Sequence, residues 1–234
     1  WSALAPLNPI RGLIDFGQFH YQIRTVLDGH VYTMSTVPRW YVPAYIMIRL
    51  PLIMLTGAAA GLALALWGKL NVPSIRRAEP VLLAIIALFP VACEVLDDGP
   101  AFTGLRHFLF VVPVLAALSG IGFDALLELL KGRGPIFARA ASVAIVGLIA
   151  WNAVQLARLH PYENLSYNQL VGGLPGAAGR YATDYWVSIM PEAVERLEAY
   201  VAKLDRRGNH PERYKVAVCG ERLPFEKEAN SRLE

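Results

Sequence analysis

Two acidic and two basic side chains lie close together in the sequence: Asp97, Asp98, Arg106 and His107. The basic pair directly precedes a long apolar run that begins at Phe108. Arginine presents a planar fork of N–H donors that matches phosphate oxygens, and its charge acts more strongly in a partly desolvated cleft. This pattern is consistent with a site for an anion such as a lipid phosphate. The alternative is that these charges simply flank a membrane helix and extend to the interface.

The composition indicates a membrane protein. The 234 residues are 55% hydrophobic and 18% charged, which is more apolar than one soluble core of this size needs. The net charge of +3 is spread among hydrophobic runs, without the stripe of Lys and Arg that contacts nucleic-acid phosphates. We therefore expect a membrane-lipid partner and no nucleic acid. Because the chain opens on Trp1, without an initiator methionine or a basic leader, we also expect it to be a fragment of a longer protein.

Four apolar runs approach the length of about 20 residues that a transmembrane helix needs. The runs are 51–68, 81–96, 108–130 and 136–156. The first extends backward through 41–50 if Arg49 snorkels or faces protein. The expected fold class is thus mainly α, a multispanning transmembrane helix bundle with a small extracytoplasmic α/β tail. The segment "GAAAG" at 57–61 is of the kind that lets helices approach closely, and packing within the bundle explains it better than a dedicated dimer interface.

The connections between these runs predict an orientation. Lys69, Arg76 and Arg77 follow the first run, and Lys131 and Arg133 follow the third. Cytoplasmic loops are enriched in Lys and Arg, so both connections should be cytoplasmic. The connection that carries the Arg-His pair, and both polar ends of the chain, then lie outside.

The polar ends divide the chain into three parts: 1–41, 42–158 and 159–234. The first is an extracytoplasmic or interfacial loop, and its stretch 10–27 has the mixed pattern of an amphipathic helix that lies on a membrane surface. The second holds the transmembrane helices. The third is an extracytoplasmic tail in which 190–205 has helical periodicity and 214–220 alternates like a strand, as in an incomplete α/β domain.

The other motifs give weaker evidence of a binding or catalytic site. The glycine-rich stretch 172–180 superficially suggests a phosphate-binding loop, but such a loop needs a strand before it, and a turn-rich connection explains it better. Cys93 and Cys219 have neither disulfide nor zinc spacing, and the five histidines have no ligand spacing. The sequence therefore predicts no metal and no cofactor.

Three stretches together resemble a known group of enzymes: "STVPRWYVPAYIMIRLPL" (35–52), "GLRHFLFVVPVLAAL" (104–118) and "HPYENLSYNQLVGGLPGAAGRYATDYW" (160–186). They are similar to the C-terminal half of multispanning glycosyltransferases of the GT-C superfamily, in particular bacterial relatives of the protein O-mannosyltransferases, glycosyltransferase family 39. The similarity runs from about residue 16 to residue 220.

This resemblance implies an enzyme of the bacterial inner membrane. It would transfer a sugar from a polyprenyl-phosphate carrier to a hydroxyl of a protein, lipid or glycan on the outer face. A carboxylate base would come from an external loop of the N-terminal module, so the resemblance names no catalytic residue here. Around the lipid phosphate it implies Arg106 and His107, with Arg39 and Tyr41 as further lining residues.

Two other classes of function remain open. A lipid-linked glycan transporter or flippase-like protein would bind the same substrate without transferring the sugar, but its polar groups would have to line a path across the bilayer. Only Glu94 approaches the interior of a span, which favours the enzyme. A non-catalytic membrane anchor that presents the tail to a partner would leave the Arg-His pair dispensable.

Overall fold

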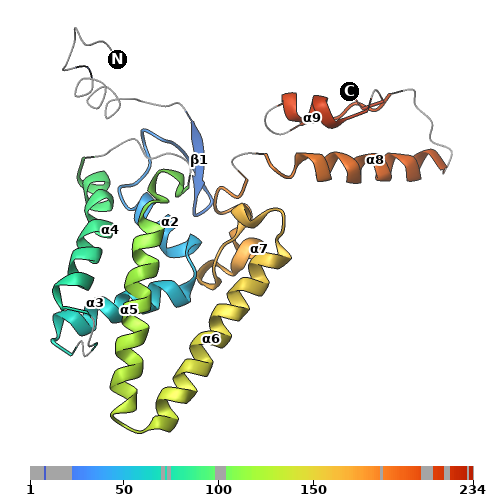
Figure 1. Cartoon of the computed structure of the whole chain (residues 1–234). Coiled ribbons are helices and arrows are strands. Elements are labelled where there is room, and N and C mark those ends of the chain that lie inside the picture. Colours follow the sequence, from blue (N-terminus) through green and yellow to red (C-terminus); the bar gives the residue numbers. More distant parts are fainter. Residues whose placement is uncertain are drawn as a thin grey trace. The chain divides into compact units, whose positions relative to one another are not determined.

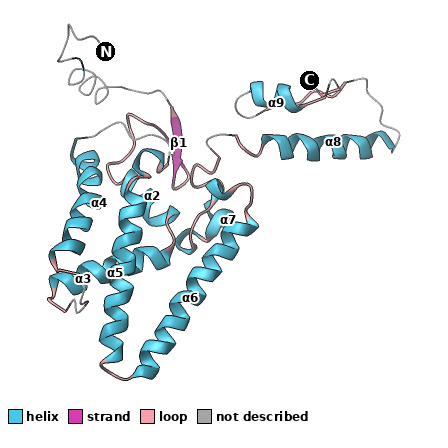
Figure 2. Cartoon of the chain, in the orientation of Figure 1, coloured by secondary structure: helices cyan, strands magenta, loops and turns pink. Residues whose placement is uncertain are grey.

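The computed structural model describes residues 8, 23–69, 72, 75–97, 104–184, 187–206, 213–218, 222–230, 232 and 233. It divides into two compact units, Trp1–Thr183 and Asp184–Glu234. The described chain is mainly helical, and its one described sheet has two strands (Figure 2). This boundary differs from the one expected at residue 159, because the segment that follows the last long helix packs into the first unit.

A β-hairpin opens the described part of the first unit. Strand β1 (Arg24–Leu27) pairs antiparallel with β2 (His30–Thr33). The two turn residues, Asp28 and Gly29, have φ of 49° and 81°, the left-handed conformation that Asp-Gly turns adopt in tight hairpins. The helical expectation for 10–27 is therefore wrong over β1, because the Asp-Gly turn and its β-branched neighbours favour strand pairing. Residues 10–22 lie outside the described residues.

The first expected span and its extension through 41–50 form two separate helices. Helix α2 (Tyr41–Arg49) and helix α3 (Leu52–Leu66) meet at an angle of 112°. Pro51 lacks a backbone N–H and forces the preceding residue out of the helical region, and Leu50 accordingly has ψ of 146°. Helix α3 has 15 residues, about 22 Å, which is shorter than the roughly 30 Å of a hydrocarbon core. The run 51–68 is therefore one helix over Leu52–Leu66, and only its extension through 41–50 is not continuous with it.

The other three expected spans are confirmed as long apolar helices. They are α4 (Ala78–Asp97), α5 (Val111–Lys131) and α6 (Pro135–Arg158). A short 3-10 helix, η1 (Arg106–Phe108), leads into α5. Among the described residues, three helices are long and apolar enough to cross a membrane, or up to four if the bent pair α2–α3 forms one span.

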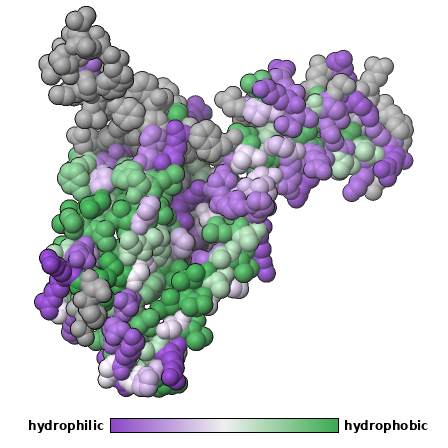
Figure 3. All heavy atoms as spheres, in the orientation of Figure 1, coloured by the Kyte–Doolittle hydropathy of each residue, from purple (hydrophilic) through white to green (hydrophobic). Residues whose placement is uncertain are grey.

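These helices expose apolar surface that a soluble protein would cover. None of the most hydrophobic part of α6 is buried, and Val143 is 73% exposed. On α4, Phe89 is 67% exposed. Figure 3 shows hydrophobic residues over much of the visible face of the helical unit, whereas the unit that contains α8 and α9 is mostly hydrophilic. Such a continuous apolar surface is typical of a chain that contacts lipid or other membrane helices.

Helices α3 and α5 are packed backbone to backbone. A Cβ added to Gly61 would lie 2.7 Å from the carbonyl oxygen of Leu118 and 3.1 Å from the Cα of Gly122. Gly57 lies against Ser119 in the same way, and the backbone of Gly57 would collide with a Cβ on Gly122. The expectation that "GAAAG" packs within the bundle is confirmed, because small residues on both helices permit this approach.

Helices α4, α5 and α6 run between two ends of this unit (Figure 1). The hairpin end carries β1 and β2, η1, and the segment 159–183 after α6. The basic end carries the connection from α3 to α4 and the turn from α5 to α6. The two connections rich in Lys and Arg therefore share one end, and the Arg-His pair lies at the other.

The second unit has a small core of its own. Helix α8 (Met190–Arg206) confirms the helical periodicity at 190–205, and α9 (Arg222–Glu228) packs against it. Val194, Val201 and Phe225 are buried between them. The expected strand at 214–220 is wrong over 215–218: only Tyr214 makes a bridge, parallel to Leu233, because the hydrophobic residues of this segment pack on α8 and α9 instead. Cys219 and Gly220 lie outside the described residues.

Candidate functional site at the hairpin end

Asn168 hydrogen-bonds to the backbone at the break between α2 and α3. The carbonyl groups at the end of α2 have no partner within the helix, because Pro51 stops the backbone pattern. The Asn168 side-chain amide donates to the carbonyl oxygens of Met47 and Leu50 at 2.6 and 2.7 Å, and its backbone N–H donates to Ile48 at 2.9 Å. Its Oδ1 accepts from the backbone N–H of Leu170 at 2.9 Å. One buried asparagine thus ties the segment after α6 to the broken helix.

Arg49 makes the reciprocal connection. Its guanidinium donates to the carbonyl oxygen of Ser166 at 3.1 Å and to that of Asn164 at 2.6 Å. It also lies 4.5 Å from the centre of the Tyr167 ring, which is within the range of a cation–π contact. The sequence left open whether Arg49 snorkels or faces protein, and the structure shows that it faces protein.

Four tyrosines extend from this arginine toward η1. Tyr167, Tyr181, Tyr45 and Tyr41 follow one another with ring centroids 5.9, 6.3 and 4.6 Å apart. The Tyr45 hydroxyl donates to the Val26 carbonyl oxygen at 3.0 Å and accepts from Ala182 N–H at 3.1 Å. The Tyr167 hydroxyl donates to the Ala182 carbonyl oxygen at 2.8 Å. Burial raises the pKa of Tyr167 well above its usual range. We call these four packed tyrosines the scaffold.

The scaffold holds the turn that carries Arg106. The buried Tyr41 hydroxyl accepts from the backbone N–H of Gly104 at 2.8 Å and pairs with the Thr25 hydroxyl at 2.9 Å. Gly104 has φ of 73°, a conformation that favours glycine, and it comes directly before Leu105 and η1. Tyr41 therefore acts through the backbone of this turn, rather than by presenting its hydroxyl to an open surface.

The predicted phosphate residues occupy different environments. Arg106 and His107 are half-buried in η1, directly before α5, as the sequence indicated. Burial lowers the pKa of His107, and the neighbouring Arg106 charge lowers it further. Arg39 is exposed, two residues before Tyr41. Asp98 lies outside the described residues, so the structure does not test the pairing of acids and bases across this turn.

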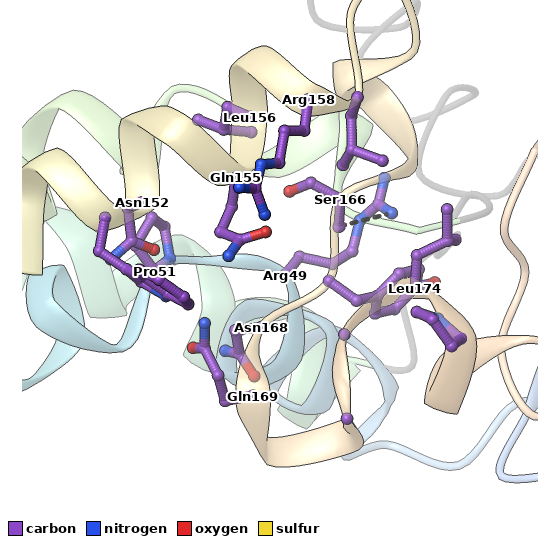
Figure 4. Close-up of a pocket in the computed structure, with 16 residues that line it drawn as sticks. Arg49, Pro51, Asn152, Gln155, Leu156, Arg158, Ser166, Asn168, Gln169 and Leu174 are labelled. Carbon is purple, nitrogen blue, oxygen red and sulfur yellow. Dashed lines mark hydrogen bonds between the residues drawn. The ribbon is translucent and has the colours of Figure 1, made fainter.

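A cavity of about 570 Å³ lies beside Arg49. Figure 4 shows Gln155 and Arg158 of α6 on one side and Asn168 and Gln169 on the other, with Arg49 between them. Its other lining residues are Pro51, Trp151, Asn152, Leu156, Leu159, Ser166, Tyr167, Gly172, Gly173, Leu174 and Pro175. None of the four residues predicted to contact a lipid phosphate lines this cavity.

The glycine-rich stretch 172–180 does not form a phosphate loop of the strand–loop–helix kind. A 3-10 helix, η3 (Gln169–Val171), precedes it instead of a strand, and helix α7 (Gly173–Ala177) has only five residues. Gly172 and Gly173 have φ of 79° and 67°, which closes a tight turn after η3. The glycines therefore shape the cavity wall through their backbone, as a turn-rich connection would.

Sequence reasoning missed the role of Asn168. One signal was available: Pro51 inside an apolar run predicts a helix break, and a broken helix buried in protein needs an external partner for its last carbonyls. The identity of that partner, more than a hundred residues later in the chain, has no local signature. The Asp-Gly turn of the hairpin was also readable, and it lies directly after the stretch 10–27 that was expected to be helical.

No protein-family model, curated protein or solved structure matches this chain. The glycosyltransferase resemblance therefore depends on its three sequence stretches. The structure gathers parts of all three at the hairpin end: Tyr41 and Arg49 from the first, Arg106 from the second and Asn168 from the third.

Proposed function

We propose that this chain is part of an integral membrane glycosyltransferase that uses a polyprenyl-phosphate-linked sugar as donor. The hairpin end faces the outside of a bacterial inner membrane, and the acceptor is a hydroxyl of a protein, lipid or glycan. The observation that carries the proposal is the position of Arg106, half-buried where η1 meets the apolar helix α5. This is the depth at which the phosphate of a membrane-embedded polyprenyl carrier resides.

The distribution of charge supports this orientation. Lys69, Arg76 and Arg77 lie in one connection of the basic end, and Lys131 and Arg133 lie in the other. All five are exposed. Sharing one end, as the positive-inside rule requires, they make that end cytoplasmic and the hairpin end external.

In this proposal Arg106 stabilises the departing lipid phosphate. Transfer breaks the bond between the sugar and the phosphate oxygen, and negative charge grows on that phosphate in the transition state. A fixed guanidinium offers two parallel N–H donors to that charge. Tyr41 is a positioning residue, because its hydrogen bond to Gly104 fixes the turn that presents Arg106. The lowered pKa of His107 favours a neutral imidazole beside the arginine, which can donate one hydrogen bond without a second charge.

The test uses the complete protein that contains this chain, reconstituted in phosphatidylcholine liposomes with polyprenyl-phosphate mannose and a hydroxyl acceptor peptide. Arg106→Ala should remove a charge-assisted contact of about 1.5 to 3 kcal/mol and lower transfer at subsaturating donor by roughly 10- to 100-fold. Arg106→Lys should recover only part of the rate, since lysine keeps the charge and loses the planar fork.

Arg133→Ala, at the basic end, is the matched control and should leave transfer unchanged. Wild-type transfer by a stable Arg106→Ala protein would contradict the phosphate assignment. Movement of the donor lipid across the bilayer without sugar transfer would favour a transporter instead. A chain that binds polyprenyl phosphate no better than polyprenol would favour the membrane-anchor reading.

A further inference from the structure

The cavity beside Arg49 has a charge pattern of its own. Among the described residues, its lining contains two arginines, Arg49 and Arg158, and no aspartate or glutamate. Three side-chain amides that can donate hydrogen bonds, Asn152, Gln155 and Gln169, also line it. Two uncompensated positive charges in one cavity attract an anion, and the amides add donors of the kind that phosphate oxygens accept.

Arg158 lies about one hydrocarbon-core thickness along α6 from Arg139. It is in the last turn of α6, and Arg139 is in the first turns of the same helix. The two are about 19 residues apart, which corresponds to about 29 Å of helix and nearly equals the roughly 30 Å thickness of a hydrocarbon core. The two arginines therefore bracket one bilayer thickness. No hydrogen bond or ion pair joins Arg158 to another described residue.

Arg49 is presented to the cavity in a fixed orientation. Two of its five N–H groups are taken by the carbonyl oxygens of Asn164 and Ser166, and Tyr167 covers one face of the guanidinium. Arg49 lines the cavity together with Gln155 and Arg158 of α6, and Figure 4 shows its guanidinium beside Ser166. A site with one arginine held rigidly is partly organised before a ligand arrives, which reduces the entropy lost on binding.

The same cavity is open to the lipid-facing side of α6. Trp151 and Leu156 line it and are 55% and 37% exposed. Tryptophan is enriched at the membrane–water interface, and the exposed surface of α6 below it is apolar. A ligand with a charged head and hydrocarbon chains would thus satisfy both parts of the site, the head among the arginines and the chains along α6.

From this juxtaposition we infer that the cavity binds the headgroup of an anionic glycerophospholipid of the outer leaflet. The site is separate from the Arg106 turn and does not depend on the proposed sugar transfer. Its phosphate contacts Arg158 and Arg49, and its acyl chains lie on the exposed face of α6. The bound lipid would brace the segment 164–175 against the broken helix, since Arg49 of α2 and Asn168 of that segment already connect the two.

The experiment measures lipid binding to the purified chain in neutral detergent by native mass spectrometry. The probes are dioctanoyl phosphatidylglycerol, dioctanoyl phosphatidylcholine and inorganic phosphate. Wild-type chain should bind phosphatidylglycerol at least fivefold more tightly than phosphatidylcholine. Arg158→Gln should weaken phosphatidylglycerol binding by about tenfold. Arg139→Gln, an arginine of the same helix at the other end, is the matched control and should change it less than twofold.

Leu174→Trp offers a second route, because it fills the cavity without changing a charge and should also weaken phosphatidylglycerol binding. Unchanged binding in both Arg158→Gln and Leu174→Trp would overturn the site. If inorganic phosphate displaced phosphatidylglycerol completely from the Arg158 site, the ligand would be free phosphate and not a lipid. Loss of phosphatidylglycerol binding in Arg106→Ala, with Arg158→Gln unaffected, would place the anion at η1 and overturn a separate cavity site. Intact lipid binding together with absent sugar transfer would refute only the proposed function.

Discussion

The two ends of the helical unit use arginine in opposite ways. At the basic end the side chains of Arg76 and Arg133 are exposed. At the hairpin end Arg49 and Arg106 are half-buried, and Arg49 is held by two backbone carbonyls and an aromatic ring. Charge alone matters at the first end, because topology depends on how many cations a loop carries. Geometry matters at the second, because a fixed guanidinium can recognise a phosphate.

This contrast has a structural cause. The basic end consists of short connections between consecutive helices, which need few contacts to close. The hairpin end gathers segments that are far apart in sequence, and buried polar groups there must find partners in one another. Side chains at the hairpin end should therefore tolerate substitution much less well than those at the basic end.

The largest effect should come from Asn168→Ala. This change removes the donor for the carbonyl oxygens of Met47 and Leu50 and the acceptor for Leu170 N–H, all at a buried position. Leaving such groups unsatisfied should lower the free energy of unfolding by about 2 to 4 kcal/mol. Chemical denaturation in detergent, followed by circular dichroism, measures the loss.

Asn152→Ala is the control for this prediction. Asn152 donates only to the carbonyl oxygen of Leu148, one turn earlier in its own helix, so its loss should cost less than about 1 kcal/mol. Equal stability of the Asn168 and Asn152 variants would show that the helix break is supported by other contacts.

A smaller difference should separate Arg49→Ala from Arg76→Ala. Arg49 bridges α2 to the carbonyl oxygens of Asn164 and Ser166, and these two acceptors lose a charged donor in the variant. We expect a loss of about 1 to 2 kcal/mol for Arg49→Ala, discounted for partial exposure, and less than about 0.5 kcal/mol for Arg76→Ala. Protease cleavage within 160–175 should become faster only in the Arg49 variant. Equal losses of stability and equal cleavage rates in Arg49→Ala and Arg76→Ala would contradict the proposed contrast between the two ends.

The smallest expected effect concerns pH. The pKa of His107 is lowered in the folded chain, first by burial and then by Arg106, so the unfolded chain binds a proton more readily. The contribution of His107 to stability is therefore complete above its unfolded pKa of about 6.5 and declines as the pH falls below that value. His107→Gln should flatten the decline in melting temperature between about pH 7 and pH 5. An unchanged slope in His107→Gln would contradict the assignment.

Hydrophobic run length predicted α4, α5 and α6, because a span in lipid must be a continuous apolar helix whatever surrounds it. The same reasoning failed for the extension of the first run through 41–50, because the helix breaks before Pro51 and Asn168 supplies the hydrogen bonds of the break. The pattern "YKVAVC" likewise reads as a strand in isolation, yet its segment packs on α8 and α9. Local sequence pattern therefore predicted the secondary structure correctly only where contacts with distant residues did not oppose it.

The candidate site divides along the same line. Arg106 and His107 were recognisable because their neighbourhood, an apolar run, is adjacent in sequence. Arg158 also follows an apolar run, but its cavity could not be read from the sequence, since the other residues that line it come from α2 and from the segment 166–175. The sequence shows the four tyrosines between Arg106 and Arg49 only as separate residues. Their arrangement in one row of contacting rings depends on tertiary packing.

By itself, the sequence determined the apolar character of the chain and the three long helices. It also determined the positive charge of the two basic connections and the small residues through which α3 packs in the bundle. Each of these follows from composition or spacing within one segment. Tertiary structure decided the break between α2 and α3, the fixed orientation of Arg49, and the cavity that it shares with Arg158. Those features require hydrogen bonds between residues more than a hundred positions apart, and the stability of a buried polar group depends on whether a distant partner reaches it.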